Sequence, residues 1–233
     1  QQAWQANTRG VLMSSPSNPT GSVAASEELR AIGDECRQRH ACLIMDEIYQ
    51  GLCFGTDRFR TALAEVPDAI EVNSFSKYFG MTGWRLGWMV VPPGAIEIMN
   101  RLAQNLFICA SSIAQEAALA AFSDESRSIM DHQRDQFEQR LEYVLPRVRD
   151  LGLEVPCEPE GAFYLYAQLP DFVPDSETFC DYALEAQGVA VTPGTDFGRH
   201  GADRHIRIAY TRDFPALSDG VDRLALALDH FGG

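Results

Sequence analysis

The chain has 233 residues, 45% of them apolar, and a formal net charge of -14 at pH 7. That length is enough to bury the core of one large domain or of two small ones. The acidic balance argues against nucleic-acid binding, because such a surface repels phosphate backbones. No apolar run approaches the roughly 18–20 residues that span a bilayer, and no leader pattern is visible, so we expect no association with a membrane.

Cysteine and histidine usage indicates a reducing compartment and no metal site. The six cysteines form no Cys-x-x-Cys pair and several stand in apolar contexts. We therefore expect reduced core thiols in a cytoplasmic protein. The five histidines show no i, i+4 spacing. His200 and His205 form only a weak pair without a third ligand, so we expect loop histidines and no bound metal.

Strand-like and helical stretches alternate in the first half of the chain. A β-rich run at 10–15 ends in a turn, and Ser26 is expected to cap a helix that carries Glu27 and Glu28 in its first turn. Further strands are predicted at 41–48, 69–75 and 85–92, and further helices at 94–107 and 111–122. Strand–helix–strand order with short links predicts an α/β domain with a mainly parallel sheet.

The pattern changes at about Asp124. A long amphipathic helix is predicted from there to Gly152, with Pro146 as a candidate kink. Its expected buried stripe is Ile129, Phe137, Leu141, Val144 and Val148. Short strands follow at 153–157, 161–169, 189–194 and 205–211, with helices at 175–188 and 214–231. Fewer and shorter strands predict a second, smaller α+β domain.

Polar side chains follow two of the predicted strands of the first half. Asn18 lies in the turn SPSNPTG, where Pro19 fixes the backbone. Open α/β sheets bind ligands at such strand ends, although an ordinary turn is the alternative reading. Asp46 ends an otherwise apolar strand, and Tyr49 follows three residues later. A buried carboxylate needs a cationic partner, so a structural ion pair or a helix cap is the alternative there.

The stretch SFSKYFGMTGWRLGW places Lys77 after a buried strand, between Ser74 and Arg85. A lysine at the end of a buried strand is costly unless it is paired, neutral or covalently used. A serine hydroxyl and an arginine fork together suit a phosphate group.

Arg207 stands in the middle of a predicted strand, between Ile206 and Ile208, so its side chain points away from theirs. It is either a bidentate carboxylate clamp or an exposed edge-strand arginine.

Taken together, these candidate residues match what one kind of cofactor needs. An aldehyde cofactor with a phosphate and a pyridine nitrogen needs a lysine for the imine, an acid for the ring nitrogen, and a phosphate site.

The motifs resemble the fold-type I, pyridoxal-phosphate-dependent aminotransferases of class I/II over essentially the whole chain. The resemblance rests on SPSNPTG, DEIYQGL, SFSKYFGMTGWRLGW, PEGAFYLY and HIRIAY in this order. It implies an α/β fold in which residues 1–123 form part of the large, cofactor-binding domain of a PLP-transferase and residues 124–233 form the smaller C-terminal α+β domain. It also implies a homodimer that exchanges an amino group between amino acid and 2-oxo acid substrates through pyridoxal 5'-phosphate.

The same resemblance implies roles for the residues of the cofactor site. Lys77 is expected to be the Schiff-base lysine and the carrier of the transferred proton. Asp46 is expected to pair with the pyridinium nitrogen, and Tyr49 to bond the ring oxygen. Ser74 and Arg85 are expected to bind the phosphate.

Two further residues are assigned to the substrate by the resemblance. Asn18 is expected to bond the ring oxygen and to approach the substrate carboxylate, which Arg207 clamps. The family carries roughly one more domain's worth of residues before the Asn-Pro-Thr-Gly turn, including a glycine/serine-rich loop and an aromatic that stacks on the ring. Nothing before Gly10 matches either, so the chain resembles the C-terminal part of an aminotransferase, with open sheet edges.

Three other readings remain open at the level of sequence. A carbon–sulfur β-lyase uses the same lysine and aspartate for elimination, and the ligand-sensing domain of a transcription regulator can borrow this fold. An inert fragment is the third. Release of a keto acid from an amino acid separates the enzymes, and a DNA-binding domain in the parent gene identifies the regulator.

Overall fold

The structure is a computed structural model that describes residues 3–55 and 61–231. Its contacts divide the chain into two compact units. The first unit comprises residues 1–17 and 23–132, and the second comprises residues 18–22 and 133–233. The boundary between folding domains at residues 123 and 124 stays a prediction.

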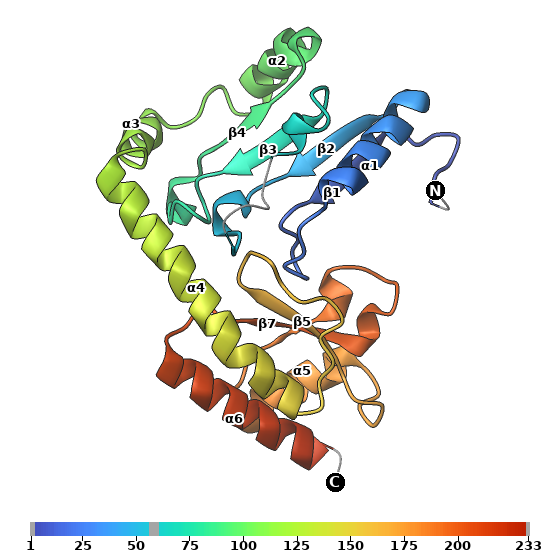
Figure 1. The fold of residues 1–233 in the computed structure, drawn as a ribbon, viewed down its shortest axis with the longest axis vertical. Coiled ribbons are helices and arrows are strands. Elements are labelled where there is room, and N and C mark those ends of the chain that lie inside the picture. Colours follow the sequence, from blue (N-terminus) through green and yellow to red (C-terminus); the bar gives the residue numbers. More distant parts are fainter. Residues whose placement is uncertain (1–2, 56–60, 232–233) are drawn as a thin grey trace. The chain divides into compact units, whose positions relative to one another are not determined.

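The first unit contains a four-stranded sheet in the order β1-β2-β3-β4 (Figure 1). Strands β1 (Gly10–Ser14), β2 (Cys42–Asp46) and β3 (Ile70–Ser74) are parallel, whereas β4 (Gly87–Val90) is antiparallel to β3. The predicted α/β class with a mainly parallel sheet is therefore confirmed. The link between β3 and β4, residues 75–86, contains no α-helix. A parallel crossover usually contains one, so the antiparallel direction of β4 agrees with this link.

Helix α1 (Ser26–Gln38) lies along one face of this sheet (Figure 1). The predicted helix is confirmed, but the predicted cap is wrong by one position. Ser26 is the first helical residue, and the preceding Ala25 N–H donates to Oε2 of Glu28 over 3.0 Å. The buried core that α1 shares with the sheet consists of Leu29, Cys36, Leu43, Met45, Ala62, Val66 and Ala69.

A second core holds the link between β3 and β4. The ring of Phe75 lies 4.7 Å from that of Phe79 and 5.1 Å from that of Trp88, measured between centroids. Met81 and Leu86 join them, together with alanines of α3 (Ser112–Ala120). Helix α2 (Ile96–Leu106) follows β4 and has no fully buried residue. The aromatic anchors fix residues 75–86 as a rigid turn rather than a loose loop.

Helix α4 (Asp124–Asp150) begins in the first unit and continues into the second. It passes through Pro146 without interruption. The predicted buried stripe is confirmed at Phe137, Leu141, Val144 and Val148. It is wrong at Ile129, which is 64% exposed, whereas the neighbouring Met130 is buried.

The second unit contains an antiparallel three-stranded sheet in the order β5-β7-β6. Its strands are β5 (Tyr164–Gln168), β6 (Thr192–Pro193) and β7 (His205–Ala209), and its helices include α5 (Ser176–Gln187) and α6 (Phe214–Phe231). The predicted strand at 153–157 is reduced to one bridge between Glu154 and Gln168. The predicted strand at 189–194 is reduced to β6, where Pro193 has no N–H to extend the ladder.

The cysteines only partly match the prediction of core thiols. Among the described residues none of the six cysteines forms a disulfide. Cys36 and Cys180 are buried, but Cys42 and Cys109 are exposed. Among the described residues, no helix is long and apolar enough to cross a membrane.

Candidate active site

Three parallel strands end side by side in the first unit. Ser14 at the end of β1 is in register with Asp46 at the end of β2, and the latter is in register with Val72 of β3. Ser74 ends β3. The sheet therefore brings the carboxyl ends of β1, β2 and β3 to one edge, which is where open α/β sheets bind their ligands.

Asp46 is half-buried at this edge rather than fully buried. Its Oδ1 accepts a hydrogen bond from the backbone N–H of Ile48 over 3.1 Å. The alternative of a structural ion pair is not observed: within residues 3–55 and 61–231, Asp46 makes no ion pair, and no donor is bonded to its Oδ2. One carboxylate oxygen is therefore still available to accept a hydrogen bond from a ligand.

Lys77 lies three residues beyond the end of β3, in the turn that the aromatic core holds. It is the only lysine in the sequence. Its Nζ lies 5.5 Å from the centroid of the Tyr49 ring, which is buried. A side chain on Gly51 would collide with the ring of Tyr78, so this glycine lets the turn after β2 pack against the residue that follows Lys77. The structure thus brings together the lysine and the tyrosine that the sequence singled out.

Hydroxyl groups and a guanidinium lie at the two ends of the same turn. The Ser74 hydroxyl donates to the carbonyl of Leu86 over 3.1 Å, and it accepts the N–H of Ser76 over 3.1 Å. The two serine hydroxyls are 2.9 Å apart. Arg85 adopts the left-handed conformation with φ of 53° and is exposed, and its Nη1 donates to the carbonyl of Thr82 over 3.0 Å. Hydroxyls beside an arginine fork are groups that bind phosphate.

In the second unit, the structure joins Asn18 and Arg207. Nη1 of Arg207 donates to Oδ1 of Asn18 over 2.8 Å, and Nη2 donates to Oγ1 of Thr192 over 3.3 Å. Arg207 is half-buried, whereas its strand neighbours Ile206 and Ile208 are buried, as the alternation along the strand predicts.

Sequence reasoning missed the aromatic residues around this arginine. Cζ of Arg207 lies 4.2 Å from the ring centroid of Tyr164 and 4.5 Å from that of Phe197. Tyr164 could have been found from the pairing of two predicted strands. Tyr166 of β5 is in register with Arg207, and Tyr164, two residues earlier, lies on the same face of the sheet as Tyr166. Phe197 stands outside any strand, and nothing in its sequence context indicates this contact.

Sequence reasoning also missed two buried acids, Glu47 directly after β2 and Glu71 within β3. Glu47 is 1% exposed; its Oε1 accepts the N–H of Ala62 over 2.6 Å, and its Oε2 has no partner in the described part of the chain. Glu71, itself buried, accepts from Thr61 and from Asn73. Burial raises the pKa of Glu47 to about 7. The hydrogen bond from the Ala62 N–H opposes this rise, and the negative charge of Glu71 adds to it.

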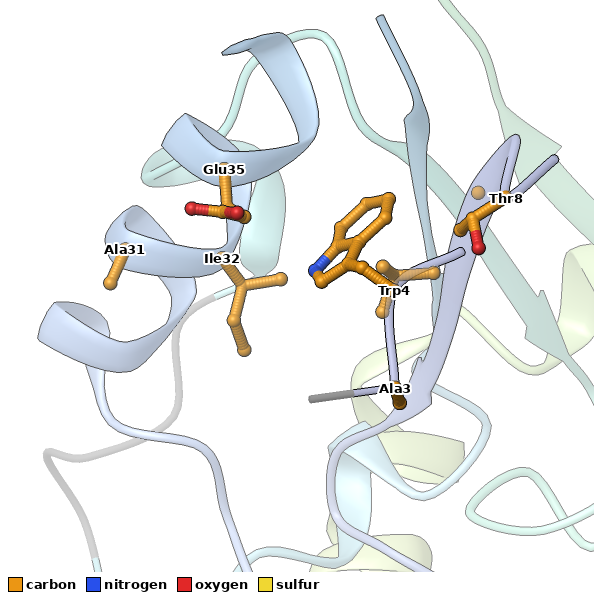
Figure 2. A pocket seen from close by; sticks show the side chains of 8 residues that line it. Ala3, Trp4, Thr8, Ala31, Ile32 and Glu35 are labelled. Atoms are coloured by element: carbon orange, nitrogen blue, oxygen red, sulfur yellow. The ribbon is translucent and has the colours of Figure 1, made fainter. Parts of the chain in front are cut away.

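A separate cavity of about 490 Å³ lies between the N-terminal segment, β1 and α1 (Figure 2). Figure 2 shows the indole of Trp4 between the helix and the strand, with Ile32 opposite it. The guanidinium of Arg39, which pairs with Glu35, lies 5.0 Å from the Trp4 ring. None of the predicted site residues lines this cavity, and its contacts are those of an anchored N-terminal tryptophan.

His200 and His205 do not assemble a metal site. No group of three or more metal-ligating side chains occurs among residues 3–55 and 61–231. The His205 ring instead stacks on Tyr166, with 4.8 Å between centroids and 8° between the planes.

Sequence and structure comparisons identify what the chain resembles. The profile of the family described as aminotransferase class I and II matches residues 1–224. The chain is 37% identical to the valine–pyruvate aminotransferase of Mycobacterium tuberculosis over 217 residues, which cover 93% of this chain and 56% of that protein. It is 35% identical to the probable N-acetyl-LL-diaminopimelate aminotransferase of Bacillus subtilis, covering 94% of this chain and 55% of that protein.

Among solved structures, the crystal structure of an aminotransferase from Mycobacterium tuberculosis superposes with a TM-score of 0.91 at 36% identity. The match covers 95% of this chain and 58% of that one. The chain therefore spans a little more than half the length of the relatives that it matches.

Proposed function

The chain belongs to the aminotransferase class I and II family, and from this premise we propose that the complete protein is a pyridoxal-phosphate-dependent transaminase. It moves an amino group between an amino acid and a 2-oxo acid. The observation that carries the proposal is the position of the only lysine, held by an aromatic core beside Tyr49 and close in sequence to Ser74 and Arg85. Cytoplasmic location and a homodimer remain parts of this proposal.

The residues present at the strand ends fit pyridoxal phosphate chemically. Asp46 has an uncommitted carboxylate oxygen for a protonated ring nitrogen, and Tyr49 brings a phenol to the lysine. Ser74 and Arg85 offer a hydroxyl and a guanidinium for the phosphate. When bound, the cofactor supplies an electron sink that makes loss of the substrate α-proton possible.

The chain's own groups divide the remaining work. Lys77 Nζ would hold the cofactor, and as an amine it would move a proton to and from the substrate. Asp46, kept in place by the Ile48 N–H, would stabilise a positive charge on the ring nitrogen of the cofactor. The aromatic side chains that anchor the turn restrict the backbone of Lys77. Its amine is therefore held in a position from which it can reach the substrate.

Arg207 and Asn18 form the proposed carboxylate site of the second unit. A guanidinium offers a planar fork that matches a carboxylate with two parallel hydrogen bonds. The bond from Nη1 to Asn18 orients this fork before substrate arrives. Elimination by a carbon–sulfur β-lyase uses the same groups, and no contact among residues 3–55 and 61–231 favours it.

Trapping with borohydride tests the proposal directly, because a reduced imine is stable and this chain offers one lysine. The complete protein is incubated with pyridoxal phosphate, reduced, digested and mapped by mass spectrometry, with a Lys77→Arg variant as the matched control. We expect the adduct on the peptide that contains Lys77, a visible absorbance band before reduction, and keto-acid production from L-valine and pyruvate or another donor in a panel of amino acids. Absence of both the adduct and the band from the wild-type protein contradicts the proposal.

A further inference from the structure

The guanidinium of Arg207 is in contact with two aromatic rings. Its Cζ lies 4.2 Å from the centroid of Tyr164 and 4.5 Å from that of Phe197. Both distances are within the range of a cation–π interaction, which stabilises a cation over the face of a ring. The guanidinium thus lies over the faces of both rings. Its N–H groups lie along its polar edge, which is where a ligand can form hydrogen bonds with it.

That polar edge has unused donors. A guanidinium carries five N–H groups. The contact with Asn18 uses one and the contact with Thr192 uses another. The Nε of Arg207 is buried and has no hydrogen-bond partner among the described residues. Leaving a buried donor unpaired costs free energy. A ligand acceptor that bonds to this N–H in the guanidinium plane removes that cost, so it should bind more tightly than it would to a solvated arginine.

The fold holds both rings in place independently of any ligand. Tyr164 is buried on β5. Phe197 ends the 3-10 turn Gly194–Asp196, where its N–H donates to the carbonyl of Gly194 over 2.9 Å. The Phe197 ring also meets Tyr166 edge-on at 6.3 Å, and Tyr166 is stacked on His205. The aromatic contacts of Phe197 therefore extend into the sheet of the second unit.

We propose that Tyr164 and Phe197 are positioning residues that hold the Arg207 guanidinium so that it receives a substrate carboxylate in its own plane. This inference rests on the proposed function. Arginine side chains have many rotamers, and ordering one on binding reduces affinity. Two rings that fix the plane in advance remove part of that loss, and they favour a planar carboxylate over other anions.

The experiment compares substrates that differ only in the carboxylate. The half-reactions of L-valine and of isobutylamine, which is valine without its carboxylate, are followed through the cofactor absorbance of the complete holoenzyme. L-Alanine and ethylamine form a second pair. The variants are Phe197→Leu and Tyr164→Leu, each with its aromatic replacement, Phe197→Tyr or Tyr164→Phe. The control is Tyr143→Leu, which removes a cation–π contact of similar length, 4.1 Å to Arg147, elsewhere in the second unit.

We expect each leucine variant to lower kcat/KM for the amino acids about fivefold, mainly through KM, as loss of a cation–π contact of about 1 kcal/mol implies. The rates with the amines should change less than about twofold. The aromatic replacements should restore the amino-acid rates, and Tyr143→Leu should change neither series. Equal losses for amino acids and amines, or no loss in either, overturn the positioning role. A wild-type holoenzyme that forms no visible band refutes the proposed function itself, and the two failures are thus distinguishable.

Discussion

Asn18 and Arg207 are 189 positions apart in the sequence, and a hydrogen bond of 2.8 Å joins them in the second unit. The acceptor comes from the polar turn after β1 and the donor from the middle of β7. Neither residue's local sequence indicates the other. Their pairing turns two weak sequence signals into one oriented donor group.

The first prediction concerns this pair. Arg207→Lys replaces the planar fork by a point charge, so it should raise KM for amino acids by about ten- to a hundredfold. Asn18→Ala should raise KM less, because it loosens the fork without removing it. Steady-state kinetics with the best amino-acid donor measures both effects, and titration with pyridoxal phosphate serves as the control.

The contrast between the two readouts decides whether Arg207 belongs to the substrate site. Cofactor affinity should stay near the wild-type value in Arg207→Lys, because the expected phosphate ligands lie in the other unit. Unchanged amino-acid kinetics would show that Arg207 is an ordinary edge-strand arginine.

Sequence patterns located the elements and residues whose signals are local. The apolar run before Asp46 and the alternation around Arg207 each follow from the period of a strand, and both were found. Glu47 was missed because it directly follows Asp46, and only the packing of Ala62 against it shows that it is buried. Phe197 was missed because an irregular segment has no period from which a facing residue can be inferred.

Two strands of the second unit are shorter than predicted for a related reason. The segments 153–157 and 189–194 have strand-like composition, but each contains a proline that cannot donate to a ladder. β-Propensity reports how well a side chain fits a pleated surface, and it does not count the missing donor.

A second prediction follows from the buried carboxyl of Glu47, whose pKa is raised to about 7. Between its unfolded pKa of about 4.3 and pH 7, the folded protein keeps a proton that the unfolded chain releases. The free energy of unfolding should therefore fall as pH rises through this window and level off above it. Glu47→Gln removes the titration and should flatten that slope, with a gain on the order of 1–3 kcal/mol at pH 8.

Urea unfolding at several pH values measures this slope. The control is Glu185→Gln, at an exposed position of α5, which should leave the pH profile unchanged. A Glu47→Gln protein that keeps the wild-type slope would show that another group carries the pH dependence.

A third prediction concerns the approach of residues 194–197 to the second sheet. A methyl group on Gly194 would collide with the carbonyl oxygen of Ala202, whereas a methyl group on Gly198 would meet nothing within 4 Å. Gly194→Ala must therefore displace the 3-10 turn, which should cost on the order of 1–3 kcal/mol of stability. It should also raise KM for amino acids by moving Phe197. Gly198→Ala is the matched control, and thermal unfolding with steady-state kinetics measures both; equal melting temperatures for the two variants would contradict the close approach.

The last prediction concerns the 233-residue chain by itself. Leu106, Phe107 and Ile108 are consecutive and 77%, 61% and 79% exposed, and in the described sheet β1 and β4 each pair on one side only. Open strand edges and exposed apolar runs promote association, so this chain alone should self-associate in solution. It should also bind pyridoxal phosphate weakly and have little transaminase activity. The relatives that it matches are longer by about the length of a further domain, and a site that lacks some of its groups positions the others poorly. Light scattering and a coupled transaminase assay test the two parts, and Phe107→Glu should reduce the association. A stable monomer with ordinary turnover, on the order of 1–1000 per second, would show that the groups found in this chain suffice for the reaction.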